Sequence, residues 1–443
     1  MTPEEKTALA TAHPLDFTIQ YPPRREYFQD NFRGPYVPAL VGAAESMLLY
    51  VHVPFCKAKC YYCNFAVDVR PDASVHKGYV DRLVKVIEAA DDLLAPSEIP
   101  GIDIGGGTPT ILATEQLERI LNALQPFKAR SPVAFPLSIE TTPFIAANDR
   151  AKLSAMVNGG VDRISVGLQS MNDEVLRSFN RREQESVGSK AVENLMTAGF
   201  KRVSVDLIFA LPGQTDEQWL SDLKRVIALG PDAITTYDCL YRGKGRALTK
   251  RTADKPSPER YGQLYDVGYD LLLASGYHAP YGSVNFSRHA GETGTSAYFE
   301  RRLLDGMPYL GLGNYASSLH GDAWWLAPYG VNAWTKAVDS GVNFPFGDCY
   351  RLPQEEVQAK YLLLSLSFGL IDTERFFKAF GMDFNQRFKR EIEYALAKNW
   401  LRQEGKKYYI VNGKFSCMPS IRSLFYSARS INWLNQQSQF VQT

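Results

Sequence analysis

The chain has 443 residues, of which 45% are hydrophobic and 22% charged, a composition typical of globular proteins. This length exceeds the usual limit of a single hydrophobic core, so two domains are expected. The formal net charge of +1, from 49 basic and 48 acidic residues, excludes a general electrostatic attraction to nucleic acid or to an anionic membrane.

The first 45 residues are predicted to form an N-terminal arm (1–45) packed over a larger body. Prolines at positions 14, 22, 23, 35 and 38 and scattered aromatic residues show no sustained period. The polar start, Thr2 to Glu5, indicates a capped helix rather than a signal peptide. The longest mostly apolar run of the chain, residues 361–371, is well short of the roughly 20 residues that span a bilayer. We therefore expect no membrane span and a cytoplasmic protein.

A regular alternation of strand-like and amphipathic helical segments begins at residue 47. Helices are expected to start at Thr114 and Ser257, and a capping box opens another at Thr215. Six such units predict parallel strands with right-handed crossovers, an α/β fold with a partial (β/α)6 barrel over residues 46–275. The six predicted strands comprise residues 48–53, 101–104, 133–140, 162–167, 202–208 and 233–237.

The remaining residues, 276–443, are predicted to form a C-terminal domain that covers the barrel and contributes to the substrate site. Residues 391–400 have a helical pattern, and residues 406–412 and 414–418 indicate a hairpin around Gly413. A helix followed by a hairpin favours a winged-helix-like module. Such modules can bind nucleic acid, but this segment is not strongly basic, so no nucleic-acid partner is expected.

Three of the six cysteines, Cys56, Cys60 and Cys63, lie within eight residues directly after the first predicted strand. Thiolates so close together can converge on one inorganic centre, and sulfur ligands favour zinc, copper(I) or an iron–sulfur cluster. A closed zinc site needs four protein ligands, and no Cys or His follows within ten residues of Cys63. Three ligands suit a [4Fe–4S] cluster with one open iron. The other cysteines are far apart in sequence and are expected to be buried thiols, namely Cys239, Cys349 and Cys417.

Polar residues also follow the other predicted strands. Gly105 to Pro109 follows the second strand, Glu140 ends the third, Gln169 follows the fourth and Asp206 lies in the fifth. Active groups of such barrels gather at the carboxyl ends of the strands. We therefore expect these residues to surround one site with the cysteines, although a glycine turn, helix caps or surface salt bridges would explain each residue alone.

The motif C-x3-C-x2-C, with Tyr62 before its last cysteine, resembles the radical SAM superfamily. The stretch from Tyr50 to Cys56 is similar to the oxygen-independent coproporphyrinogen III oxidase family, which also includes a haem chaperone and enzymes that transfer methyl or methylene groups with two molecules of S-adenosylmethionine (SAM). The resemblance implies a [4Fe–4S] cluster that binds SAM at its open iron and cleaves it to a 5′-deoxyadenosyl radical. It also implies an electron donor such as flavodoxin or ferredoxin.

The resemblance further assigns roles to individual residues. The three cysteines would ligate the cluster, and residues 309–318 would line the region of the substrate and of a second SAM. Glu140, Asn314 and Tyr315 are the candidate catalytic residues there. The residues expected to shape the SAM pocket are Tyr50, Tyr62, Gly106, Gly107, Thr108, Glu140, Gln169, Arg181 and Asp206.

Three departures from the family pattern are present. Phe65 stands where the coproporphyrinogen oxidases have a further cysteine, residues 313–318 lack the histidine of the haem chaperone, and Ala210 replaces a glycine. The departures at Phe65 and in residues 313–318 favour methyl or methylene transfer to a porphyrin or natural-product scaffold. We therefore expect a small aromatic or tetrapyrrole-like substrate. Oxidative decarboxylation of propionate side chains and haem delivery without turnover are the alternatives.

Overall fold

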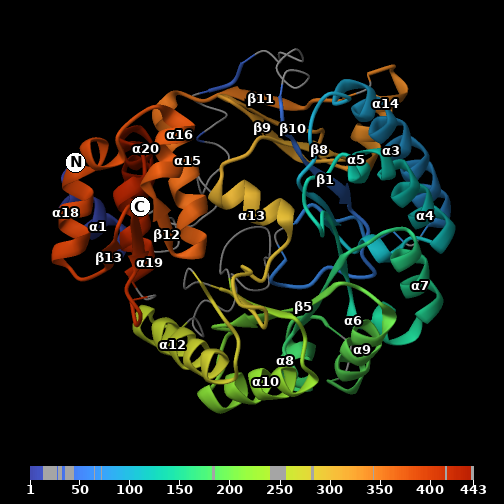
Figure 1. Ribbon diagram of the computed structural model, residues 1–443, viewed down its shortest axis with the longest axis horizontal. Coiled ribbons are helices and arrows are strands. Elements are labelled where there is room, and N and C mark those ends of the chain that lie inside the picture. The colour runs from blue at the N-terminus through green and yellow to red at the C-terminus, as the bar shows by residue number, and fades with distance from the viewer. Residues whose placement is uncertain are drawn as a thin grey trace.

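The elements of the chain are arranged around one large sheet (Figure 1). Among the described residues this sheet has eleven strands, and a second sheet has three. None of the described helices is both long enough and apolar enough to cross a bilayer. The computed structural model describes residues 1–12, 27, 32–34, 44–63, 65–70, 72–181, 185–239, 256–280, 284–342, 344–414 and 417–440.

The first six strands are parallel, and each pairs with the next along the chain. Their registers place Asp103 beside both Tyr50 and Ser138, and Ser138 beside Arg163. The predicted parallel core of the α/β fold is thereby confirmed. The strands are β1 (Leu48–Val53), β2 (Ile102–Gly106), β3 (Leu137–Thr141), β4 (Arg163–Gln169), β5 (Arg202–Phe209) and β6 (Ala233–Asp238).

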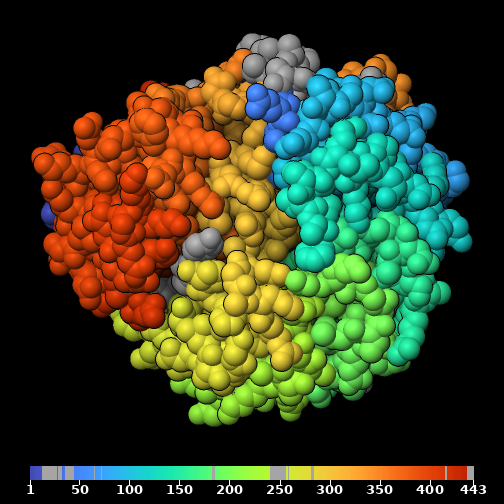
Figure 2. Space-filling view, viewed as in Figure 1, coloured from blue at the N-terminus to red at the C-terminus, as the bar shows by residue number. Residues whose placement is uncertain are grey.

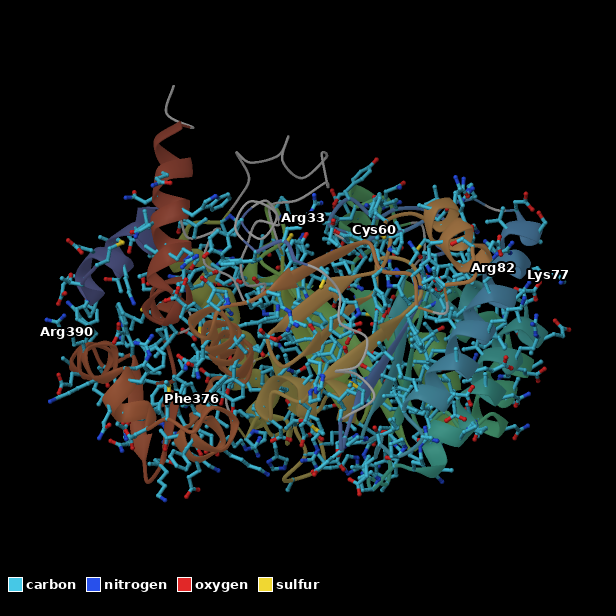
Figure 3. All side chains as sticks on the ribbon, turned by 90° about the horizontal axis from the view of Figure 1, so that it is seen from above. Arg33, Cys60, Lys77, Arg82, Phe376 and Arg390 are labelled. Carbon is cyan, nitrogen blue, oxygen red and sulfur yellow. The ribbon has the colours of Figure 1, made fainter. Side chains whose placement is uncertain are left out.

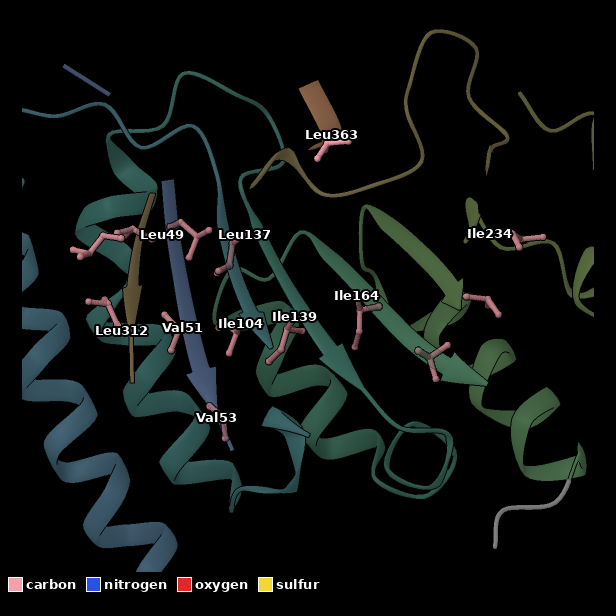
Figure 4. Packing of buried hydrophobic residues seen from close by; sticks show 14 of the residues in the cluster. Leu49, Val51, Val53, Ile104, Leu137, Ile139, Ile164, Ile234, Leu312 and Leu363 are labelled. Carbon is pink, nitrogen blue, oxygen red and sulfur yellow. The ribbon is translucent and has the colours of Figure 1, made fainter. Parts of the chain in front are cut away.

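Successive side chains of β1 face opposite sides of the sheet, as the pleat of a strand requires. Leu49, Val51 and Val53 are fully buried in the main hydrophobic core, among apolar residues of the neighbouring strands (Figure 4). Tyr50 and His52 point to the other side, into the barrel. One face of the strand therefore holds the sheet to the helices, while the other face is free to carry polar groups.

Helices connect the strands and begin at predicted capping residues. The Thr215 hydroxyl accepts a hydrogen bond from the Gln218 amide at 3.2 Å, and the Gln218 side chain accepts one from the Thr215 amide at 3.1 Å. Ser257 caps the last of these helices, as expected. The connecting elements are α3 (Ala73–Leu93), η3 (Pro109–Ile111), α4 (Thr114–Ala123), α5 (Gln125–Ala129), α6 (Pro143–Asn148), α7 (Arg150–Asn158), α8 (Asp173–Ser178), α9 (Glu185–Ala198), α10 (Asp216–Leu229) and α12 (Pro258–Ala274).

The sheet continues past the six predicted strands on both sides. β8 runs parallel to β1, with Leu48 beside Tyr309, so that β1 lies inside the sheet between β2 and β8. The added strands follow residue 276 and still belong to the barrel sheet, and the division into domains at 275/276 stays a prediction. They are β7 (Asn285–Ser287), β8 (Tyr309–Leu312), β9 (Ser317–His320), β10 (Ala323–Leu326) and β11 (Asp348–Arg351), with α13 (Ala297–Leu304) and α14 (Val331–Asp339) between them.

A C-terminal module, residues 354–440, forms a continuous body beside the barrel (Figure 2). Its three-stranded sheet has the order β12-β14-β13 and lies among helices, as in a winged helix. The predicted hairpin around Gly413 is wrong, because the turn lies at Gly405 and a helix follows Gly413. The elements are α15 (Gln354–Ser365), η5 (Leu366–Phe368), β12 (Leu370–Asp372), α16 (Thr373–Phe380), α17 (Phe384–Arg387), α18 (Lys389–Ala397), β13 (Leu401–Glu404), β14 (Lys407–Ile410), α19 (Met418–Phe425) and α20 (Ala428–Phe440).

The start of the chain packs on this C-terminal module. Helix α1 (Pro3–Ala12) begins after a reciprocal pair of bonds between Thr2 and Glu5, as its sequence predicted. The Lys6 ammonium donates to the Leu424 carbonyl at 2.9 Å and pairs with Glu391. Most of the predicted arm, residues 13–26, 28–31 and 35–43, lies outside the described residues.

Candidate active site

The cysteine loop, residues 54–63 and 65–68, follows β1 and is closed by backbone hydrogen bonds. The Asp68 amide donates to the Pro54 carbonyl at 2.8 Å, and the Cys56 amide donates to the Asp68 carbonyl at 3.0 Å. Inside the loop the Cys63 amide donates to the Cys60 carbonyl at 3.1 Å. The loop therefore holds the three cysteines together at the carboxyl end of β1.

The three thiols lie close enough to influence one another. Burial raises the pKa of the Cys56 thiol to about 11; the Thr108 hydroxyl, 3.6 Å from Cys56 Sγ, acts against this, and the nearby Cys63 and Cys60 thiols add to the rise. No disulfide joins these cysteines. The donors are thus three converging free thiols, which metal binding would deprotonate.

Three thiols are a donor set that a [4Fe–4S] cluster can use. In the part of the chain that the structure describes, no three His, Cys, Asp or Glu side chains gather tightly enough to hold one metal ion. A cubane is bound by one thiolate on each of several irons, so its ligands stand further apart than those of one ion. Three thiolates would leave one iron open for another ligand.

Hydrogen bonds tie the cysteine loop to the end of α8 and to β4. Arg181 donates from Nη1 to the Tyr62 hydroxyl at 2.8 Å and from Nη2 to the Gly167 carbonyl at 2.9 Å. Asn180 Nδ2 donates to the Lys59 carbonyl at 3.1 Å. Two residues expected in the SAM pocket, Tyr62 and Arg181, are therefore in direct contact although they are far apart in sequence.

The glycine run ends β2 in a space that is too narrow for side chains. A Cβ on Gly105 would lie 3.0 Å from the Glu140 carboxylate. A Cβ on Gly106 would lie 2.6 Å from the His52 ring, and one on Gly107 would lie 2.6 Å from a carbonyl of the cysteine loop. Packing within the protein thus requires glycine at positions 106 and 107, independently of the ligand that we expected to explain the run.

His52 joins β1 to the cysteine loop. Its Nε2 lies 3.2 Å from the Ala66 carbonyl and its Nδ1 lies 3.4 Å from the Tyr50 hydroxyl. Burial lowers the pKa of His52 to about 4, so the imidazole is neutral at pH 7. This side chain positions both the loop and Tyr50.

Three carboxyl groups from neighbouring strands face the inside of the barrel. Burial raises the pKa of Glu140 to about 8, with Asp206 and Asp103 adding to the rise, and burial raises the pKa of Asp103 to about 7. Burial also raises the pKa of Asp206, which accepts a hydrogen bond from Ser165 at 2.8 Å. Arg163, on β4, lowers the pKa of all three. Glu140 is therefore mostly protonated at pH 7 and can give up its proton near neutral pH.

Glu140 and Tyr237 are accessible to solvent on the inner face of the sheet. Tyr237 is 46% exposed, and Glu140 is exposed as well. The surrounding strands nevertheless raise the pKa of both side chains by desolvation. The Glu140 carboxyl is therefore not sealed inside the hydrophobic core.

Gln169 ends β4 in an unusual backbone conformation. Its φ of 69° is positive, and the register between β4 and β5 shifts between Gly167 and Gln169. A Cβ on Gly167 would meet Gln169 Nε2 and come within 4.0 Å of Arg181 Nη1. The bulge therefore turns Gln169 back beside Arg181, and such strained positions are frequent at functional sites.

The segment after β8 contains two candidate catalytic residues, and their surroundings differ. Asn314 is buried at 2% exposure, and its amide donates to the Tyr79 hydroxyl at 3.0 Å. Tyr315 has a positive φ of 56°, and its ring lies edge-on to Tyr329 at 5.0 Å. The contacts of Asn314 suit a packing role, and its contact with a second SAM stays a prediction, as does that of Tyr315.

Several polar residues of the barrel interior did not enter the predicted site. Arg163 donates to Ser138 at 3.3 Å, and Ser296 donates to Asp103 at 2.7 Å. Arg302, on α13, donates to two tyrosine hydroxyls. The sequence did contain a signal for Asp103, because a charged residue in the middle of an apolar strand indicates the inner face of the barrel. The sequence around Arg302 contained no comparable signal.

Comparison with known proteins agrees with this geometry. The family model described as the radical SAM superfamily matches residues 50–226, which contain the cysteine loop and four of the further strand ends. Among solved structures, coproporphyrinogen III oxidase (HemN) from Escherichia coli superposes with a TM-score of 0.75 at 24% identity, covering 90% of this chain and 95% of that chain. This match confirms the fold.

Curated relatives cover most of the chain. Haem chaperone HemW from Synechocystis is 30% identical over 328 residues, 72% of this chain and 77% of the relative. Oxygen-independent coproporphyrinogen III oxidase from Salmonella typhimurium is 26% identical over 415 residues, 89% of this chain and 88% of the relative. The cofactors of the superfamily are a [4Fe–4S] cluster and SAM. The chain belongs to the radical SAM family of the haem chaperones and the oxygen-independent coproporphyrinogen III oxidases.

Proposed function

We propose that the protein is a radical SAM enzyme that transfers a methyl or methylene group from a second SAM to a tetrapyrrole-like or other aromatic scaffold. Cys56, Cys60 and Cys63 would hold the cluster. When bound, the cluster supplies the electron that cleaves SAM and yields a 5′-deoxyadenosyl radical. The protein's part is to bind and orient SAM and the substrate and to exclude water from the radical.

The observation that carries the proposal is the accessible, protonated Glu140 inside the barrel. Glu140 raises the pKa of Cys63 in the cysteine loop and the pKa of the exposed Tyr237, so it is near both. A carboxyl whose pKa is about 8 can donate a hydrogen bond at pH 7 and can exchange a proton with a bound substrate. A haem carrier without turnover has no need of such a group at this depth.

Other residues of the pocket would orient the first SAM. Arg181 is placed to bind a carboxylate with its guanidinium while Tyr62 holds one of its nitrogens. Gln169 lies beside it, and Asp206 stands further along the same inner face. The second SAM would lie between Glu140 and residues 309–318. Such placement makes radical attack on its methyl group intramolecular, an effect worth up to about 7–11 kcal/mol.

Isotope labelling tests this proposal. The anaerobically reconstituted enzyme is incubated with a chemical reductant, trideuteromethyl-SAM and a panel of tetrapyrroles. We expect deuterium in 5′-deoxyadenosine, S-adenosylhomocysteine as a second product, and a CD2-derived carbon on the scaffold. Absence of deuterium from 5′-deoxyadenosine, together with entry of substrate hydrogen, would refute transfer from a second SAM.

A second candidate is oxidative decarboxylation of propionate side chains. It is favoured by the match to oxidases over 89% of this chain and by the fold shared with the Escherichia coli oxidase. In the same labelling experiment it predicts substrate hydrogen in 5′-deoxyadenosine and release of carbon dioxide. Stoichiometric capture of haem without any product would instead support the chaperone function. A cytoplasmic location is part of each of these proposals.

A further inference from the structure

A buried carboxylate on α10 supports the turn that follows β4. Asp222 is 2% exposed, and it accepts hydrogen bonds from the Ser170 hydroxyl at 2.6 Å and from the Met171 amide at 2.9 Å. These two donors directly follow Gln169, whose φ is 69°. A residue other than glycine keeps such a conformation only where its surroundings hold it. Asp222 therefore fixes the chain at the point where it leaves the strand in a strained conformation.

The two donors need two acceptor atoms on one side chain. The Met171 amide can only donate, and the Ser170 oxygen already accepts a hydrogen bond from the Asn172 amide at 3.1 Å. A carboxylate satisfies both donors, whereas asparagine would have one acceptor atom and would turn its NH2 group toward the other donor. Burial raises the pKa of Asp222 to about 6, and the bonds from Ser170 and Met171 act against this rise. The carboxylate is therefore mostly ionised at pH 7, and bonds to an ionised acceptor are the stronger kind.

Further hydrogen bonds extend this support along the chain to Arg181. The Asn172 side chain accepts hydrogen bonds from the amides of Glu174 and Val175 and so caps α8. After this short helix the Arg181 amide donates to the Leu176 carbonyl at 3.0 Å. The backbone of Arg181 is therefore fixed relative to the turn that Asp222 holds.

The turn and Arg181 are also neighbours in space. Ser170, Met171 and Arg181 line one cavity of about 10 Å³ together with Leu176 of α8. Such a volume has room for about one water molecule, so the groups around it are closely packed. Arg225, also on α10, donates to the Met171 carbonyl at 3.2 Å and adds a second bond from the same helix. A displacement of the turn would therefore change the packing against Arg181.

We propose that Asp222 is a positioning residue for SAM binding, because through the turn after β4 it places the Arg181 guanidinium where this group binds the carboxylate of SAM. The inference rests on the place of Arg181 in the SAM pocket, which is part of the proposed function. Asp222 acts through the Ser170 hydroxyl and the Met171 amide and is not itself a ligand of SAM.

Three variants test the proposal: Asp222→Asn, Ser170→Ala and Arg181→Ala, with the first also combined with the third. Asp222→Asn keeps the size of the side chain and offers one acceptor to two donors. Ser170→Ala removes one of the two bonds and keeps the carboxylate, so it gives a result even where the first variant folds poorly. Asp162→Asn is the matched control, because Asp162 is 8% exposed, directly precedes β4 at the other end of the strand, and accepts a hydrogen bond from the Leu137 amide at 3.2 Å.

The dissociation constant of SAM is measured by calorimetry on the anaerobically reconstituted protein, together with its iron content. We expect Asp222→Asn to weaken SAM binding by about tenfold and Ser170→Ala by about threefold, both at the wild-type iron content. In the Arg181→Ala background, Asp222→Asn should weaken binding by less than about twofold, because the group that Asp222 places is then missing. Without SAM, hydrogen exchange of residues 170–181 should be faster in Asp222→Asn. Asp162→Asn should leave the dissociation constant and this exchange unchanged.

The outcomes separate this inference from the proposed function. Wild-type affinity in both Asp222→Asn and Ser170→Ala, with weakened binding in Arg181→Ala, would overturn the inference alone. An undiminished effect of Asp222→Asn in the Arg181→Ala background would also overturn it, as would equal weakening by Asp162→Asn, because the carboxylate would then act on the fold as a whole. Wild-type affinity in Arg181→Ala would refute the place of Arg181 in the SAM pocket, and the inference would fall with it. No reaction product enters these measurements, so failure of methyl transfer from a second SAM would leave them valid.

Discussion

The barrel and the C-terminal module are built on different principles. The inner face of β1–β6 carries carboxyls, an arginine and tyrosines, with the cysteine loop and Gln169 at the strand ends. The C-terminal module instead closes around an aromatic cluster centred on Phe376, whose ring lies 4.8 Å from Phe380 and 5.3 Å from Phe384. The barrel retains buried polar groups that cost stability and that we propose to serve the reaction, whereas the module is stabilised mainly by apolar packing. The predictions below test this contrast.

The largest effect is expected from the cysteine loop. Cys60→Ala should abolish the brown colour, the bound iron and SAM cleavage, because a cluster with two protein ligands is not held. Iron and sulfide per chain, measured after anaerobic reconstitution, report the loss. Cys349→Ala is the control, since Cys349 lies at 8% exposure on β11, and equal loss of iron in that variant would refute the assignment.

The aromatic cluster should matter for stability alone. Phe376, labelled in Figure 3, is fully buried, and Phe376→Ala should cost about 3–5 kcal/mol. Urea unfolding measures the loss, and hydrogen exchange should locate it in α16 to α19 rather than in β1 to β5. Phe377→Ala, at an exposed neighbouring position, should cost much less. Loss of iron from Phe376→Ala would contradict the separation of the two regions.

Arg181 should affect SAM and leave the iron in place. A hydrogen bond to a charged group contributes roughly 1.5–3 kcal/mol, so Arg181→Ala should weaken SAM binding by about one to two orders of magnitude. Calorimetry on the reconstituted protein gives the constants. Arg177→Ala, an exposed position on α8, should bind SAM like the wild-type protein. Equal SAM affinities of the two variants would show that Arg181 has a purely structural role.

Asp103 should make stability depend on pH. Its pKa is about 7 in the folded protein, so it stays protonated there while its unfolded counterpart ionises above about pH 4. The folded state then binds more protons, and stability falls as pH rises between these values, by at most about 1.4 kcal/mol per unit. Thermal unfolding of Asp103→Asn should show a flatter dependence from about pH 5 to about pH 7. Asp92→Asn, exposed on α3, should keep the wild-type slope.

The smallest effect concerns backbone strain after β5. Ala210 has a φ of 59°, a left-handed conformation in which its Cβ is unfavourable. Ala210→Gly should stabilise the protein by about 0.5–1 kcal/mol, the relief of strain being partly offset by the freedom of glycine in the unfolded chain. Ala233→Gly, in an ordinary strand conformation, should destabilise it. Destabilisation by both substitutions would show that Ala210 is not strained.

The sequence predicted those parts of the fold whose period is long enough to be distinctive. The six parallel strands and the helices after Thr215 and Ser257 were found because apolar residues recur over whole elements. The five added strands have only three or four residues each, too few for a period. Gly405 and Gly413 both have positive φ, and only tertiary packing selects Gly405 as the hairpin turn.

The candidate site was predictable where residues follow strand ends. Gln169 and Asp206 were placed by that rule, and the structure brings them to one face of the barrel. Arg163 was not found, because it begins its strand and reaches the site only along the inner face. The contact between Tyr62 and Arg181 joins two segments that no local pattern connects.

The place of β1 between β2 and β8 has a consequence during synthesis. β1 ends at residue 53, but its neighbour β8 begins only at residue 309, so the ribosome synthesises β8 much later. Until then the strand that leads into the cysteine loop presents a bare edge, which is a site for aggregation. A fragment of residues 50–226 would keep the three cysteines, Glu140, Gln169, Arg181 and Asp206, yet would leave that edge open. The segment that carries the chemistry is therefore smaller than the segment that must be made before it can fold.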